Sequence, residues 1–175
     1  MTRVRGGPVS DARPPEPLVR AINPVVRTLV RSPFGRRIPA LAVIEYRGTR
    51  TGRRRRVVVA WHELGGRAFA LTPAGWRANF VDGASALVRH SGQTLTMTGS
   101  LEPRPETVAS TLRAHLAAGG SARSLGLRVA AGHEIDAADV RVLGRSIVWF
   151  DPQPNPPSGE RVRQSEPASA ESANS

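Results

Sequence analysis

Short apolar runs rich in β-branched residues alternate with turn signals through the middle of the chain. Such runs suit a half-buried, pleated surface, so each of them predicts a β-strand. The predicted strands cover residues 41–46, 57–62, 67–72, 85–90, 93–101 and 145–150. Gly65-Gly66 between the second and third strands is a hairpin signal. The pattern therefore predicts a β-meander of about six strands.

A second, helical spacing of apolar residues occurs outside these runs. The predicted helices start at Asn23-Pro24, at Thr72-Pro73, at Pro105, near residue 122 and at Asp136. The first should end near Ser32-Pro33, and the fourth is a short helix within 122–130. We read Asp136, together with Glu134 and Asp139, as capping carboxylates at a helix start.

Two terminal segments lack any apolar periodicity. Residues 1–17 are rich in Pro, and residues 152–175 are rich in Pro, Ser, Asn and Glu. Such segments bury little apolar surface, so we expect two disordered tails. Residues 18–151 are long enough for one domain with a core. The prediction is an α+β, mainly β domain over 18–151, with an N-terminal helix and peripheral C-terminal helices.

Charge adds a preference for anions. The formal net charge is +11, and residues 18–150 hold 20 Arg against eight acids. This positive field does not by itself distinguish a nucleic acid, an anionic membrane and an acidic cofactor as the partner.

The chain has no cysteine, which excludes disulfides and thiolate chemistry. No apolar run approaches the roughly 20 residues of a membrane helix, so we expect a cytoplasmic protein without stable membrane insertion, with peripheral contact through the first helix left open.

The most informative segment is residues 47–56, with six Arg and two Gly between predicted strands. Gly48 and Gly52 permit positive φ and let backbone N–H groups approach an oxyanion. Arginine adds planar forks that fit phosphate and carboxylate groups. The segment predicts an anion-binding turn. Because strand side chains alternate, Arg53 to Arg56 cannot all serve one ligand, and one of them should be solvated or pair with an acid such as Glu63.

A turn feeds a short predicted helix at residues 72–80. A helix start offers N–H groups and partial positive charge, so Pro73 to Gly75 could help to hold an anion. The alternative is that Trp76 and Phe80, four residues apart, simply pack into the core.

Other candidate sites are weak. The four histidines, at positions 62, 90, 115 and 133, show no metal-ligand spacing, so no metal site is expected. Ser91 and Ser146 lack a G-x-S-x-G context, which leaves hydrolase chemistry unsupported.

Together, the two clusters resemble the deazaflavin-dependent nitroreductase and quinone reductase family of split β-barrel, FMN-binding-like proteins. Tyr46-Arg47-Gly48-Thr49-Arg50-Thr51-Gly52-Arg53 resembles that family's R-G-R-x-[ST]-G-type turn, and Trp76-Arg77-Ala78-Asn79-Phe80 resembles its W-x-x-N-[LF] segment. The likeness covers about residues 23–102, and agreement is weaker to 150. Two features depart from it: only Pro73-Ala74-Gly75 separates Thr72 from Trp76, and Tyr46 is the single tyrosine.

The resemblance implies binding of the deazaflavin coenzyme F420 and hydride transfer to a quinone, nitro compound or other electron-poor small molecule. The Arg50-Thr51-Gly52 turn and Arg55 would hold the coenzyme's phosphate and acidic tail, and Trp76 and Asn79 would lie near its ring or the substrate. The implied cofactor-binding set is Arg47, Gly48, Arg50, Thr51, Gly52, Arg55, Pro73, Ala74, Trp76 and Asn79. No catalytic side chain is implied, because the coenzyme carries the reactive carbon.

Two alternatives stay open. The same barrel could bind FMN, haem or another anionic cofactor without catalysis, since fold does not determine function. A nucleic-acid-binding module would use the basic field, but aromatic residues form only 5% of the chain and none lies within 47–56. We therefore expect no nucleic-acid partner. A monomer and a homodimer are both compatible with the sequence.

Overall fold

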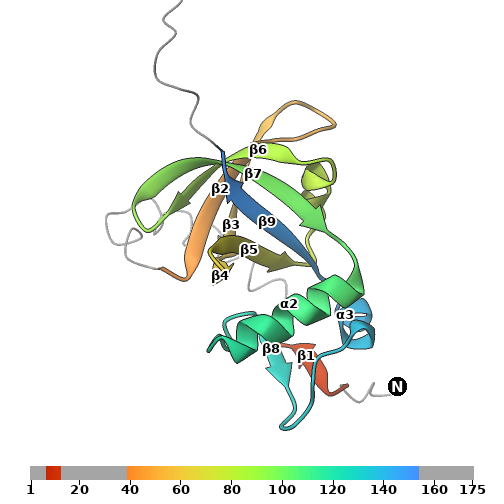
Figure 1. Ribbon diagram of the computed structural model, residues 1–175. Helices are drawn as coiled ribbons and strands as arrows, with labels where there is room; N and C mark the ends of the chain where they lie inside the picture. Colours follow the sequence, from red (N-terminus) through yellow and green to blue (C-terminus); the bar gives the residue numbers. More distant parts are fainter. Residues whose placement is uncertain (1–6, 13–38, 154–175) are drawn as a thin grey trace, which may run out of the picture.

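Seven strands form one curled antiparallel sheet in the computed structural model, which describes residues 7–12 and 39–153 (Figure 1). In chain order they are β2 (Leu41–Arg47), β3 (Arg54–Ala60), β4 (His62–Leu64), β5 (Arg67–Thr72), β6 (Ala84–His90), β7 (Gln93–Glu102) and β9 (Ser146–Pro152). Their order across the sheet is β3-β2-β6-β7-β9-β5-β4. The predicted mainly β fold is confirmed, and the predicted N-terminal helix at Asn23-Pro24 lies outside the described residues.

The two edge strands of this sheet are neighbours in the chain. Only Trp61 separates β3 from β4, and its backbone N–H donates to the Ala40 carbonyl at 2.9 Å. The chain therefore leaves one edge and returns at the other, which curls the sheet into a half-barrel (Figure 1). The predicted 57–62 strand is divided at this point. Gly65 and Gly66, at φ of 58° and 78°, form the predicted hairpin turn between β4 and β5.

Strand alternation divides the buried side chains into two cores. The inner core lies inside the half-barrel and includes Ile44, Tyr46, Trp61, Phe80, Met97, Val148 and Phe150. The outer core lies on the other face of β5 and β9 and includes Phe69, Leu71, Leu112, Leu127, Ile135 and Ile147. On β9, for example, Val148 points into the inner core and Ile147 into the outer core.

Two helices and a small ribbon complete the outer core. They are α2 (Pro105–Ala117), α3 (Ala137–Leu143) and the two-stranded sheet of β1 (Val9–Asp11) and β8 (Leu127–Val129), which lie together beside β5 and β9 (Figure 1). Asp136 and Asp139 form a capping box at the start of α3, as predicted. Glu134 does not cap; it pairs with Arg113 at 3.1 Å. No helix within the described ranges is long and apolar enough to cross a membrane.

The ribbon corrects two expectations. The short helix predicted within 122–130 is wrong, because Leu127–Val129 is a strand paired antiparallel with Val9–Asp11. The expectation of a loose tail is also wrong for Val9–Asp11, where Val9 is 4% exposed. The reason is tertiary. Each strand is three residues long, and each is stabilised by a partner more than a hundred residues away that no local pattern reveals.

Candidate anion-binding site

The arginine-rich turn joins β2 to β3 and is held by its own backbone. The Gly48 N–H donates to the Arg53 carbonyl at 2.9 Å, and the Gly52 N–H donates to the Gly48 carbonyl at 2.7 Å. Gly52 has φ of 62°, a conformation that side chains with a Cβ disfavour. The turn is thus a closed, defined loop whose tip carries Thr49, Arg50 and Thr51.

This closure changes the expected role of the glycines. The N–H groups of residues 48, 49, 51, 52 and 53 all donate to protein acceptors, and among turn residues 48–53 only the Arg50 N–H has no partner in the described part of the chain. Most backbone N–H groups of the turn are therefore engaged within the protein, and the Arg50 N–H is the one among residues 48–53 that no described residue engages, which leaves it for an oxyanion. The other groups of the turn that could hold an anion are arginine side chains.

Asn79 connects the turn to η2 (Gly75–Phe80), a short 3-10 helix thirty residues later. Its Oδ1 accepts from the Thr49 N–H at 2.9 Å and from the Thr49 hydroxyl at 3.2 Å. Its Nδ2 donates to the Trp76 carbonyl at 2.7 Å. All three bonds orient the amide, so Asn79 acts as a clamp between the two segments that the sequence singled out.

An aromatic cluster lies behind this clamp. The Tyr46 ring centroid is 6.4 Å from that of Trp76 and 5.4 Å from that of Phe80, and Trp76 meets Phe80 edge-on at 5.8 Å. Phe80 is fully buried, whereas Trp76 is only partly buried. The core-packing alternative therefore describes Phe80, and Trp76 lies at the rim of the inner core, where a planar ligand could reach it.

Tyr46 is a candidate that the sequence analysis did not select. It lies opposite Arg55 in the β2–β3 pairing, and its hydroxyl has no hydrogen-bond partner among the described residues. Burial raises the pKa of the Tyr46 hydroxyl, although the nearby Arg55 acts in the opposite direction. The phenol is therefore a neutral donor at physiological pH. The signal was available, since Tyr46 continues the alternation of Ala42 and Ile44 into the inner core.

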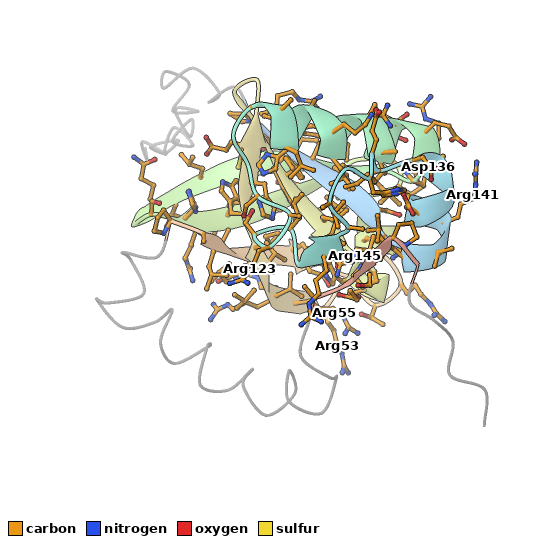
Figure 2. The ribbon with its side chains drawn as sticks, turned by 90° about the horizontal axis from the view of Figure 1, so that it is seen from below. Arg53, Arg55, Arg123, Asp136, Arg141 and Arg145 are labelled. Atoms are coloured by element: carbon orange, nitrogen blue, oxygen red, sulfur yellow. The ribbon has the colours of Figure 1, made fainter. Side chains whose placement is uncertain are left out.

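Adjacent arginines serve opposite faces of the sheet. Arg55 opposes the inward-facing Tyr46, and Arg54 opposes Arg47 on the outer face. Arg55 lies across the turn, because a Cβ placed on Gly48 would be 3.4 Å from its Nε. Figure 2 shows Arg53 and Arg55 close together, at a distance from Asp136 and Arg141. The predicted set thus divides: Arg50 and Arg55 remain at the turn and its inner side, whereas Arg47 belongs to the outer face.

The arginines also differ in their partners. Arg56 forms an ion pair with Glu45, not with the suggested Glu63. Arg47, Arg50, Arg53, Arg54 and Arg55 make no ion pair with any acid in residues 7–12 and 39–153. All five are exposed, and those at positions 50, 53 and 55 lie at the turn or on its inner side. These three form an uncompensated positive patch next to the aromatic rim.

Pro73 and Ala74 are exposed at the start of η2. The Ala74 N–H donates to the Thr72 hydroxyl at 3.1 Å, and the Ala74 carbonyl accepts from Arg77. The helix that follows is a six-residue 3-10 helix, so it lacks the aligned dipole of a longer α-helix. Within the described chain, the hydrogen bonds of Ala74 stay inside residues 72–77, and none reaches the arginine turn.

Three of the four histidines pack against other rings, and the fourth, His133, bonds to Asp139 at 2.7 Å. His62 and His115 are buried with ring centroids 5.4 Å apart, and His90 stacks on Trp61 at 5.3 Å. In residues 7–12 and 39–153, no three His, Asp or Glu side chains gather as a possible metal-binding group.

Comparison of the chain with family models found no match, and a search of curated proteins found no significant match.

Proposed function

We propose that this chain is a cytoplasmic split-barrel reductase that binds the deazaflavin coenzyme F420 and reduces a quinone, nitro compound or similar electron-poor small molecule. The observation that carries the proposal is the Asn79 clamp. It brings the arginine turn and the Trp76 segment, the two motifs that resemble the deazaflavin-dependent family, into one site. The same bond places the tip of the turn against the helix that carries Trp76.

The side chains at this site fit such a coenzyme in two respects. Arg50, Arg53 and Arg55 are exposed and make no ion pair with a described acid, which suits a phosphate and an acidic tail. Trp76 and Tyr46 offer aromatic surface beside them, which suits a planar ring. The backbone of the turn is closed by its own hydrogen bonds without a ligand, which lowers the cost of ordering this backbone on binding.

The protein's share of the chemistry is positional. A bound reduced deazaflavin would supply the hydride, and the side chains would orient it and exclude water. Arg55 and the neutral Tyr46 hydroxyl lie where they could stabilise negative charge that develops on an acceptor. Asn79 is a positioning residue, because its Oδ1 and one of its Nδ2 hydrogens already hold Thr49 and Trp76.

The test is a fluorescence titration of the purified protein with oxidised deazaflavin coenzyme, with FMN as comparator, at near-physiological salt. Arg50→Ala, Arg55→Ala and Trp76→Ala should each weaken binding about tenfold or more, as expected for loss of a charge-assisted bond or a stacked ring. Arg54→Ala is the matched control, since it removes the same charge from the other face of β3.

The outcomes separate the alternatives. Equal weakening by Arg54→Ala and Arg55→Ala would mean that only the general positive field attracts the coenzyme. Absence of deazaflavin binding by a folded wild type would reject the proposal. Tight FMN binding in that case would favour a different cofactor on the same sheet.

A further inference from the structure

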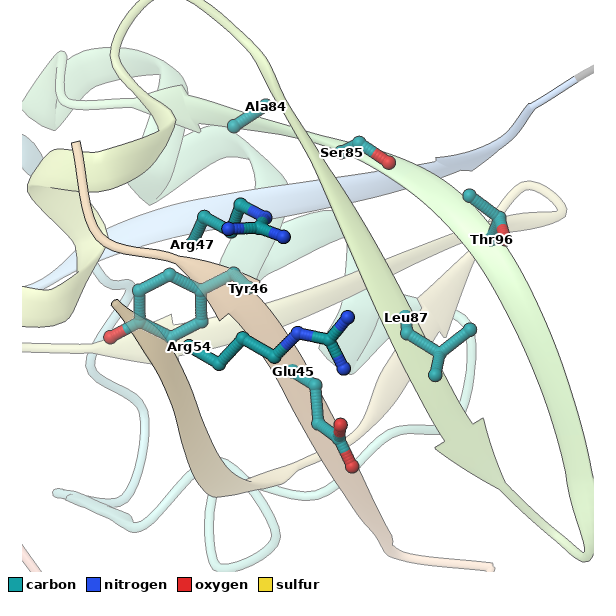
Figure 3. A pocket seen from close by; sticks show the side chains of 8 residues that line it. All are labelled: Glu45, Tyr46, Arg47, Arg54, Ala84, Ser85, Leu87 and Thr96. Carbon is teal, nitrogen blue, oxygen red and sulfur yellow. The ribbon is translucent and has the colours of Figure 1, made fainter. Parts of the chain in front are cut away.

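A groove of about 520 Å³ lies on the outer face of the sheet, over β2, β3, β6 and β7. Its polar and apolar walls are formed by Glu45, Arg47, Arg54, Ser85, Leu87 and Thr96. Figure 3 shows the guanidinium groups of Arg47 and Arg54 pointing toward β6, which carries Ser85 and Leu87. Helices α2 and α3 pack over β5 and β9 and leave this part of the face uncovered by them.

Arg47 and Arg54 are directly opposite each other in the antiparallel β2–β3 pair. Opposed side chains in such a pair have Cβ atoms about 5 Å apart, and like charges there are destabilising. Neither arginine pairs with an acid among the described residues. The Nη1 of Arg47 donates one hydrogen bond to the Gly52 carbonyl at 3.3 Å, and the other N–H groups of its guanidinium remain available to a ligand. The pair is therefore a concentrated positive charge facing a groove.

The acid in the groove does not neutralise this pair. Glu45 lies between two other arginines: its Oε1 accepts a hydrogen bond from Arg56 and forms an ion pair with Arg89 Nη1 at 2.7 Å. Its side chain is 18% exposed. Because Glu45 is already engaged twice, an incoming anion meets Arg47 and Arg54 rather than competing with a free carboxylate for them.

We propose that this groove binds the phosphate group of a small organic phosphate, at a site separate from the coenzyme site. The guanidinium forks of two directly opposed arginines match a phosphate, whose three terminal oxygens can engage both forks, better than a carboxylate with two oxygens. The hydroxyls of Ser85 and Thr96 can donate further bonds, and Leu87 offers an apolar wall to the organic part. The groove volume exceeds that of a phosphate ion and lies within the ordinary range for small-molecule sites.

The groove favours a small molecule over a nucleic-acid strand. Single-stranded nucleic acids require aromatic platforms for successive bases. The one aromatic residue at the groove, Tyr46, belongs by strand alternation to the inner face and packs on Phe80 there. The opposite orientation of Arg54 and Arg55 also separates this site from the proposed coenzyme site, so the two can be tested independently.

The experiment is an amide NMR titration with AMP, and with adenosine as the uncharged comparator. AMP should shift the amides of Ser85, Leu87 and Thr96, and adenosine should not. Arg54→Gln should weaken this AMP binding about tenfold or more, because it removes a charge-assisted fork. Arg55→Gln, the matched variant on the other face, should keep the AMP affinity within about twofold of the wild-type value.

Several results would overturn the inference. They are equal binding of adenosine and AMP, shifts confined to Thr51 and Gly52, and equal losses in Arg54→Gln and Arg55→Gln. A single-stranded oligonucleotide that binds the groove far more tightly than AMP, with a steep salt dependence, would assign it to nucleic acid instead. A parallel coenzyme titration on the same variants keeps the two proposals distinct, since Arg54→Gln should affect AMP alone.

Discussion

The Thr49 amide lies 2.9 Å from the Oδ1 of Asn79, and the Thr49 hydroxyl lies 3.2 Å from the same atom. One side-chain oxygen therefore holds the tip of the arginine turn against a helix thirty residues away. The same Asn79 donates to the Trp76 carbonyl, so the positions of the turn and of the tryptophan are coupled. Any ligand that uses both segments depends on this amide.

Asn79→Ala should release the turn. The variant loses three hydrogen bonds at a partly exposed position, which we expect to cost about 1–2 kcal/mol in free energy of unfolding. Amide exchange at Thr49 should accelerate in the variant, and coenzyme affinity should fall. Thr49→Val is the control, because it removes the hydroxyl bond and keeps the bond from the backbone N–H. Unchanged exchange at Thr49 in Asn79→Ala would show that the turn is ordered without the clamp.

Gly99→Ala should disturb the core beneath Trp76. A Cβ at Gly99 would lie 2.4 Å from Cδ1 of Phe80 and 3.2 Å from Cε1 of Phe150, and both rings are fully buried. We expect a loss of about 1–3 kcal/mol from overpacking. Thermal unfolding and near-ultraviolet circular dichroism would report it. Gly75→Ala is the control, since its Cβ meets nothing within 4 Å, and a comparable loss there would contradict the packing explanation.

His62 should make the fold sensitive to mild acid. Burial, reinforced by the nearby His115, lowers the pKa of His62 from 6.5 to about 4. Between these values the unfolded chain binds a proton that the folded chain does not, so the free energy of unfolding falls as pH drops from about 6.5 toward 4. The full effect is on the order of 3 kcal/mol.

Urea denaturation at a series of pH values between about 7 and 4.5 would measure this slope. In His62→Phe, which keeps an aromatic ring beside Phe69 and His115, the slope should become shallower. An identical slope in the variant would assign the acid sensitivity to other groups.

Arg145→Ala should loosen the β1–β8 ribbon. Arg145 is 2% exposed and donates to the carbonyls of Leu125 at 2.7 Å and Gly126 at 3.0 Å, and it pairs with Asp11. Loss of this network should cost about 2–4 kcal/mol. Arg67→Ala is the comparison, because the Arg67–Asp151 pair is about half exposed and should contribute about 1 kcal/mol. Equal costs in denaturant melts would argue against a special role for the buried arginine.

Much of the fold was predictable because its signals are local. The runs that form β2 and β5 contain continuous apolar stretches, and the run that forms β7 alternates polar and apolar positions around Met97. Gly65-Gly66 specifies a hairpin turn wherever it lies. Asp136 and Asp139 form their capping box within four residues, so nothing distant is needed to specify it. The β1–β8 pairing is the opposite case: its two strands are more than a hundred residues apart, so no local signal predicted it.

The candidate site was predictable in composition and not in arrangement. The arginine turn and the Trp76 segment are visible as residue types in order, and their charge predicts a preference for anions. The partner of Asn79, the division of Arg54 and Arg55 between two faces, and the engagement of Glu45 by two arginines all depend on where β3 begins and on its register with β2. A shift of the β2–β3 register by one residue would move every side chain of β3 to the opposite face of the sheet. Register is set by long-range packing, so the sequence alone determined which groups are present, and only the tertiary structure decided which of them act together.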